Sequence, residues 1–191
     1  MTLLSLVHGF GETTAVLAAG KPKAGAKSEP PAVAAKAAPV RSDSLPAAVE
    51  DMCEAIMAAV RTGRIGELRT AHDLNELKPE IGPEVVPDPI EYWKKLSADG
   101  DGREILSVLW TLLEGSFATA PLGRDIENNK LYIWPSLAEK PLASMTPLEE
   151  VELLRLVPPA EAAAMKARGH YTGWRLVIGA DGTWHSFKKA Q

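Results

Sequence analysis

Three side chains near the carboxyl end of the sequence are of types that bind or react with small polar ligands. They are Tyr171, Arg175 and His185, and their spacing places them on one face of a predicted β-hairpin. An arginine holds a carboxylate or phosphate through two parallel hydrogen bonds, and a histidine exchanges a proton near neutral pH. We therefore interpret these residues as candidate ligand-binding groups for an anionic or carbonyl compound. The competing interpretation is a solvated outer strand face, which is common in antiparallel sheets.

The hairpin itself is indicated by Asp181-Gly182, which separates two runs rich in aromatic and β-branched residues. A type I turn with Gly182 in the left-handed conformation pairs Gly179 with Thr183. This register predicts a core face made of Trp174, Leu176, Ile178 and Trp184. It assigns to the opposite face Tyr171, Arg175, Val177, His185 and Phe187. A two-residue turn would shift the register and exchange the faces.

The residues before the hairpin predict mostly helix. Apolar residues at helical spacing run from Val49 to Val60, and Gly63 ends this stripe. Helix starts are indicated at Asp88-Pro89, at Asp101 as a cap, and at Thr146, where Glu149 completes a capping box. Residues 131–134 predict a strand, which we expect to pair with residues 116–119. The fold class is therefore α+β, with five or six helices packed on a small antiparallel sheet that ends in the hairpin.

Other candidate chemical motifs have simpler structural interpretations. The run from Asp99 to Glu104 resembles the start of a calcium loop, but the twelfth position, which requires Glu, is Trp110. His72 and Glu76 lie four residues apart, and an exposed polar pair is favoured over a metal site. The lone Cys53 lies in an apolar stripe and is expected to be a buried structural thiol. The sequence contains no phosphate-binding loop, dinucleotide fingerprint or hydrolase motif, so we expect no metal and no cofactor, and a non-catalytic role is favoured over an enzyme.

Composition bounds the class and the location of the protein. The 191 residues are 46% apolar and carry a net charge of −4, which argues against a nucleic-acid partner. No stretch approaches the ~20 apolar residues of a membrane span. Residues 1–20 are typical of a degraded signal peptide, residues 21–44 of a disordered linker rich in Ala, Pro and Lys, and residues 45–191 of a single α+β domain. These features predict a periplasmic or secreted protein, with a cytoplasmic location as the alternative.

Two resemblances extend this interpretation. From Ile90 to Phe187 the chain resembles a group of small exported alphaproteobacterial proteins that have no assigned activity. The resemblance rests on residues 99–104, 131–135, 146–156 and 171–187. It implies export, without a mechanism. The order of a long helix at 49–60, a glycine turn, a short helix at 65–77 and a final Asp-Gly hairpin is also similar to the NTF2-like superfamily, which implies a pocket-bearing domain.

Three functions follow as hypotheses. The first is a non-catalytic module of the cell envelope that binds an unknown protein or small molecule. The second is an NTF2-like pocket domain that binds or hydrolyses a small anionic or carbonyl ligand through Tyr171, Arg175 and His185. The third is a cytosolic accessory protein whose basic tail contacts an acidic partner.

Overall fold

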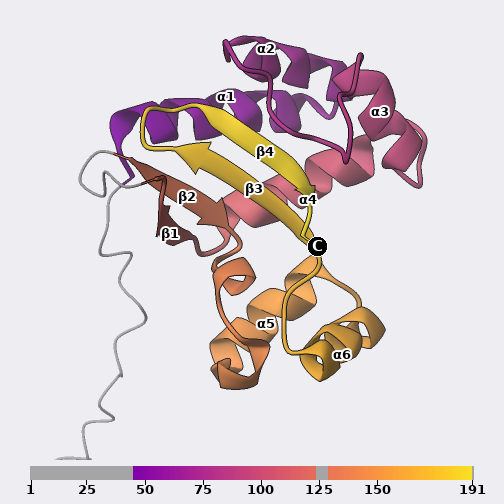
Figure 1. The fold of residues 1–191 in the computed structure, drawn as a ribbon. Coiled ribbons are helices and arrows are strands. Elements are labelled where there is room, and N and C mark those ends of the chain that lie inside the picture. Colours follow the sequence, from indigo (N-terminus) through magenta and orange to yellow (C-terminus); the bar gives the residue numbers. More distant parts are fainter. Residues whose placement is uncertain (1–44, 124–128, 191) are drawn as a thin grey trace, which may run out of the picture. The chain divides into compact units, whose positions relative to one another are not determined.

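Four antiparallel strands form the sheet of the protein, and the first four α-helices pack on it (Figure 1). The strands are β1 (Ala118–Pro121), β2 (Lys130–Trp134), β3 (Trp174–Gly179) and β4 (Trp184–Lys189), and they lie side by side in the order β1-β2-β3-β4. In this computed structural model the described residues are 45–123 and 129–190, so the predicted signal segment and linker lie outside them. The predicted α+β fold, with its helices and its final hairpin, is confirmed. The predicted pairing of residues 131–134 with the segment after residue 116 is also confirmed, because Ala118 lies opposite Ile133.

The turn of the β3-β4 hairpin has the predicted geometry. Gly182 has a φ of 84°, and its N–H donates to the Gly179 carbonyl at 2.9 Å. The Gly179 N–H donates to the Thr183 carbonyl at 2.8 Å. The Asp181 carboxylate also accepts a hydrogen bond from the Thr183 N–H at 2.9 Å. The turn therefore fixes Ile178 opposite Trp184.

The prediction for Phe187 is wrong because β4 contains a β-bulge. Ile178 pairs with Trp184, but Val177 pairs with Ser186, so His185 is an extra residue in β4. One extra residue reverses the alternation of faces in the rest of the strand. Phe187 consequently lies opposite Leu176, fully buried in the main core, where the sequence had placed it on the outer face.

The main core lies between one face of the sheet and the first four α-helices (Figure 1). These are α1 (Ala47–Thr62), α2 (Leu68–Asp73), which follows a 3-10 turn at Ile65–Glu67, α3 (Pro89–Leu96) and α4 (Arg103–Glu114). The predicted stripe of α1 is buried from Val49 to Val60, and Gly63 ends the helix with a φ of 66°. The indole of Trp93 on α3 stacks on that of Trp184, with ring centroids 6.0 Å apart. The predicted core face of the hairpin is thereby confirmed.

Caps account for where two of these helices begin. The Asp88 carboxylate accepts hydrogen bonds from the N–H groups of Ile90 and Glu91, as the sequence predicts. At α4 the capping carboxylate is Asp99 rather than Asp101. It accepts from the N–H groups of Gly102 and Arg103, each at 3.0 Å. Gly102, with a φ of 81°, turns the chain so that the carboxylate two residues before Asp101 reaches the first turn.

A second, smaller cluster lies between β2 and β3 in the sequence. Its helices are α5 (Pro147–Leu156) and α6 (Pro159–Arg168), which follow 3-10 turns at Ser136–Glu139 and Leu142–Ser144. The predicted capping box of Thr146 and Glu149 opens α5. The cluster is built around Leu137, Leu153, Met165 and Tyr171, all buried. Among the described residues, no helix is long and apolar enough to cross a membrane.

Candidate functional site

The structure does not bring the three predicted ligand-binding residues into one pocket. Tyr171 is 4% exposed in the second cluster, and its hydroxyl donates to the Trp174 carbonyl at 3.0 Å. Arg175 forms an ion pair with Glu139. His185 is the bulged residue of β4, and its ring lies with the Asp181 side chain beside Gly179. Their role in ligand binding stays a prediction, and Tyr171 alone lines one of the hollows described below.

A pocket of about 380 Å³ lies where the ends of β3 and β4 meet α3 and α4. We call it the edge pocket, and it falls within the size range of small-ligand sites. Its apolar part combines aromatic and aliphatic side chains from five segments of the chain. The lining residues are Ile81, Gly82, Pro83, Tyr92, Leu96, Glu104, Ile105, Trp174, Lys188, Lys189 and Ala190.

Local structure explains why these side chains meet. Tyr92 and Leu96 are four residues apart on α3 and therefore share a face, while Trp93 between them points into the core. The indole of Trp174 stacks on Phe187, with ring centroids 4.7 Å apart, so a pocket wall rests directly on the core. Leu96 is 46% exposed, which leaves an apolar surface open at the pocket.

Gly82 allows the aromatic wall to approach the backbone. A Cβ added at Gly82 would lie 2.8 Å from the hydroxyl oxygen of Tyr92. Any larger residue would displace the tyrosine ring, so this glycine shapes the pocket.

The charges around the edge pocket leave one exposed cation. Lys188 pairs with Glu80, and this hydrogen bond lowers the pKa of the Glu80 carboxyl. The Glu104 carboxylate accepts a hydrogen bond from the Ala98 N–H at 2.6 Å. Lys189 is exposed, and its ammonium lies 5.9 Å from the centroid of the Trp174 ring. No ion pair of Lys189 is found within the described residues, so the pocket presents a cation beside an aromatic wall.

A small hollow of about 130 Å³ continues from the edge pocket along α4. The two share Glu104 and Trp174, and the hollow adds Arg155 and Tyr171. The hydroxyl of Tyr171 is already bonded to the backbone, so this residue closes the hollow rather than offering a free polar group.

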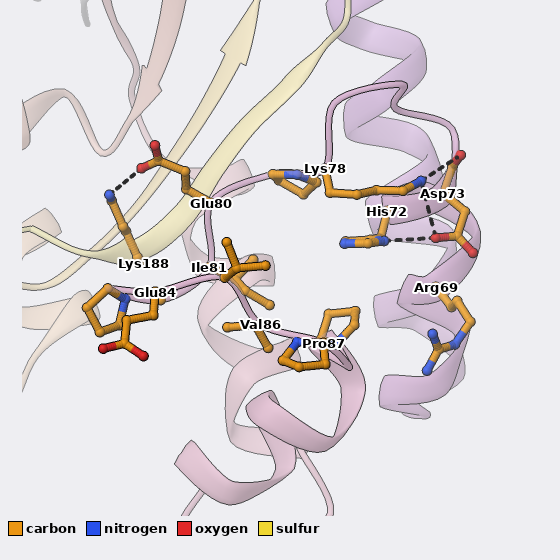
Figure 2. A pocket seen from close by; sticks show the side chains of 15 residues that line it. Arg69, His72, Asp73, Lys78, Glu80, Ile81, Glu84, Val86, Pro87 and Lys188 are labelled. Atoms are coloured by element: carbon orange, nitrogen blue, oxygen red, sulfur yellow. Dashed lines mark hydrogen bonds and ion pairs between the residues drawn. The ribbon is translucent and has the colours of Figure 1, made fainter.

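A wider cavity of about 700 Å³ lies on the other side of segment 81–83 (Figure 2). We call it the proline cavity, because its wall includes Pro79, Pro83, Pro87 and Pro89. His72 lines it and is 7% exposed, which corrects the prediction of an exposed polar pair with Glu76.

One ring nitrogen of the His72 imidazole has a hydrogen-bond partner, and none is found for the other among the described residues. Its Nδ1 lies 2.9 Å from Asp73 Oδ1, a contact that lowers the pKa of the Asp73 carboxyl. Figure 2 shows the other ring nitrogen pointing away from Asp73. The cations around the cavity are each matched to an acid: Arg69 to Asp88, Lys78 to Asp73 and Lys188 to Glu80. Among the described residues, no serine, threonine or cysteine lines the cavity.

The third surface of interest is an exposed apolar stripe on α5. Leu148, Val151 and Leu154 are each about half exposed, at 52%, 55% and 52%. They follow one another at helical spacing but line none of the cavities described above. Within the described residues, no three His, Cys, Asp or Glu side chains gather as ligands for a metal ion.

Sequence reasoning missed most of the edge pocket. The pair Tyr92 and Leu96 carried a signal, because both are large apolar residues at i and i+4 on a helix whose other apolar residues are sufficient for the core. The approach of segment 81–83 to the end of β4 carried none. It depends on contacts between residues more than one hundred positions apart.

No protein-family model, curated protein or solved structure matches this chain.

Proposed function

We propose that this protein is a non-catalytic binding module of the cell envelope, and that its binding site is the edge pocket. The main support for the proposal is that an open apolar wall lies beside an exposed cation. Tyr92, Leu96 and Trp174 form the wall, and Lys189 supplies the charge. Such a site favours a ligand that has an apolar group and a negative charge next to it.

Two of the titratable groups that line the pocket already have partners, which favours binding over catalysis. Glu104 is engaged by a backbone N–H, and Lys188 is engaged by Glu80. The polar groups around the apolar wall are thus arranged to position a ligand and not to exchange protons with it.

The proposal is tested by titration with anilinonaphthalene sulfonate, an apolar anion whose fluorescence rises on binding. In the Leu96→Glu variant we expect the affinity to fall at least about tenfold, because a carboxylate replaces apolar surface and repels the dye. Leu96 is half exposed, so the variant should fold normally.

Leu154→Glu is the matched control, since Leu154 is exposed to a similar degree on α5. Its affinity for the dye should equal that of the unmodified protein. Loss of binding in Leu154→Glu with retention in Leu96→Glu would move the site to the α5 stripe and reject the proposal.

A second function is favoured by one observation at the proline cavity. The His72 ring is held through Nδ1 by Asp73, which leaves the other nitrogen to act as a base toward water. A histidine base held by a carboxylate is one component of a site that hydrolyses a small carbonyl compound. The corresponding test is hydrolysis of p-nitrophenyl acetate by the His72→Ala variant, with His170→Ala as the control at an exposed histidine. A rate lost in the first variant only supports this function, and equal rates in both variants reject it.

A further inference from the structure

The outer edge of β4 is paired along its first part by segments from far away in the sequence. The Trp184 N–H donates to the buried Asn75 side chain at 2.7 Å. The Glu80 N–H donates to the His185 carbonyl, and the Phe187 N–H donates to the Glu80 carbonyl, both at 2.9 Å. Glu80 thereby forms a single parallel bridge to β4.

Beyond this bridge, β4 has outward-facing backbone groups for which no partner is found among the described residues. The Ala190 N–H donates inward to the Gly173 carbonyl at 2.8 Å. Because backbone groups alternate sides along a strand, those of Phe187 and Lys189 point away from β3. In the part of the chain that the structure describes, no hydrogen bond outside the strand ladder is found for the Phe187 carbonyl or the Lys189 N–H.

The chain's own segment stops pairing at the edge pocket. Further parallel pairing would need Gly82, where the chain bends beneath the hydroxyl of Tyr92. Gly82 and Lys189 both line the pocket, so the unfinished edge runs along its border. An edge with free donors and acceptors is a template for another strand.

We propose that the ligand of the edge pocket is an extended peptide that pairs with the β4 edge at Phe187 and Lys189. It inserts one large apolar side chain between Tyr92 and Trp174 and places an acidic side chain beside Lys189. This inference rests on the proposed binding function and names its ligand class. Backbone pairing supplies affinity and the pocket supplies selectivity, as in other cases of strand addition.

The geometry of the pocket and of β4 fixes the spacing of the peptide's side chains. Side chains two residues apart lie on the same face of a strand. Lys189 lies on the pocket face of β4, since its ammonium sits over the Trp174 ring. The apolar residue and the acidic residue of the peptide are therefore separated by one residue of any type.

Blocked heptapeptides test this inference. The probe has the sequence Ala-Asp-Ala-Phe-Ala-Asp-Ala, and its binding is measured by calorimetry against peptides with Ala for Phe or Lys for Asp. We expect each replacement to weaken binding at least about tenfold. A higher salt concentration should also weaken binding of the parent peptide. Two further peptides carry N-methyl groups on alternate amides, one on the odd-numbered and one on the even-numbered set. Only one set of amides faces β4, so one of these peptides should lose binding and the other should bind like the parent.

Two variants at one position separate backbone pairing from charge. Lys189→Ala removes the ammonium and keeps the N–H, whereas Lys189→Pro removes both without breaking a bond to β3. Lys189→Ala should lower the affinity for the peptide up to about fivefold, and Lys189→Pro should lower it by about a further tenfold. Anilinonaphthalene sulfonate has no backbone, so it should bind both variants equally.

The outcomes distinguish this inference from the proposed function. If the dye binds at the pocket but the peptide does not, or if both N-methylated sets bind alike, the ligand is a small apolar anion and strand addition is rejected. If Leu96→Glu leaves dye binding intact, the binding function itself fails.

Discussion

At the scale of single residues, burial decides which polar groups are free to take part in chemistry. Burial, aided by the nearby Glu50 charge, raises the pKa of the Cys53 thiol to about 12, so the thiol stays protonated at neutral pH. Burial likewise raises the pKa of the Tyr171 hydroxyl well above its usual range. Both groups are of reactive types, yet the fold uses them for packing and for one hydrogen bond to the backbone.

The Tyr171→Phe variant tests this interpretation. At neutral pH we expect it to lose about 1 kcal/mol of unfolding free energy, because the hydrogen bond to the Trp174 carbonyl is removed. In alkali the unfolded tyrosine ionises near pH 10 while the buried one stays neutral, so the native protein holds more protons and loses stability as the pH rises. Urea unfolding between pH 7 and 11 should therefore show a shallower alkaline decline in the variant than in the unmodified protein. Parallel declines would show that Tyr171 is not the buried neutral group described here.

At the scale of helices and strands, features that depend on neighbouring residues can be predicted from the sequence, and features that depend on distant contacts cannot. The hairpin turn, the Asp88 cap and the Thr146 capping box were predictable because each depends on residues only a few positions apart. The bulge at His185 was not, because its outer edge is held by the distant Asn75 and Glu80.

The same limit applies to the candidate site. The aromatic and charged residues of the hairpin were visible as candidates, but which face they occupy depends on the bulge. Trp174 was correctly assigned to the core face, and the structure shows that it also forms a wall of the edge pocket. A residue at the rim of a core serves both packing and binding, and sequence alone does not separate the two.

Gly182 offers a direct test of the hairpin's docking on α1. Its φ of 84° disfavours any side chain, and an added Cβ would also lie 2.7 Å from the Ala48 carbonyl oxygen. We expect Gly182→Ala to lower the unfolding free energy by roughly 2–4 kcal/mol, from backbone strain and displacement of α1 together.

Gly169→Ala is the matched control, since Gly169 has a φ of 85° but open space around it. This variant should cost only about 1 kcal/mol in the same urea titration. Equal losses in the two variants would mean that the turn does not press against α1.

At the scale of the whole molecule, the envelope location is a proposal that fractionation can decide. We expect the protein in the periplasmic or secreted fraction, with a mature N-terminus that begins after residue 20. N-terminal sequencing of the purified protein checks this. An intact first residue in the cytosolic fraction would reject the envelope location and favour the accessory-protein alternative, while leaving the edge pocket argument unaffected.

Two partly exposed tryptophans at different places report whether a ligand binds at the edge pocket. Trp174 forms a wall of the pocket, while Trp110 is 45% exposed on α4 and bonds to Glu114. In nitrogen-15 NMR spectra recorded during titration with the Phe-containing heptapeptide or the dye, the indole N–H signal of Trp174 should shift progressively to saturation and that of Trp110 should stay in place. A shift of the Trp110 signal while the Trp174 signal stays in place would show that the ligand does not bind at the edge pocket.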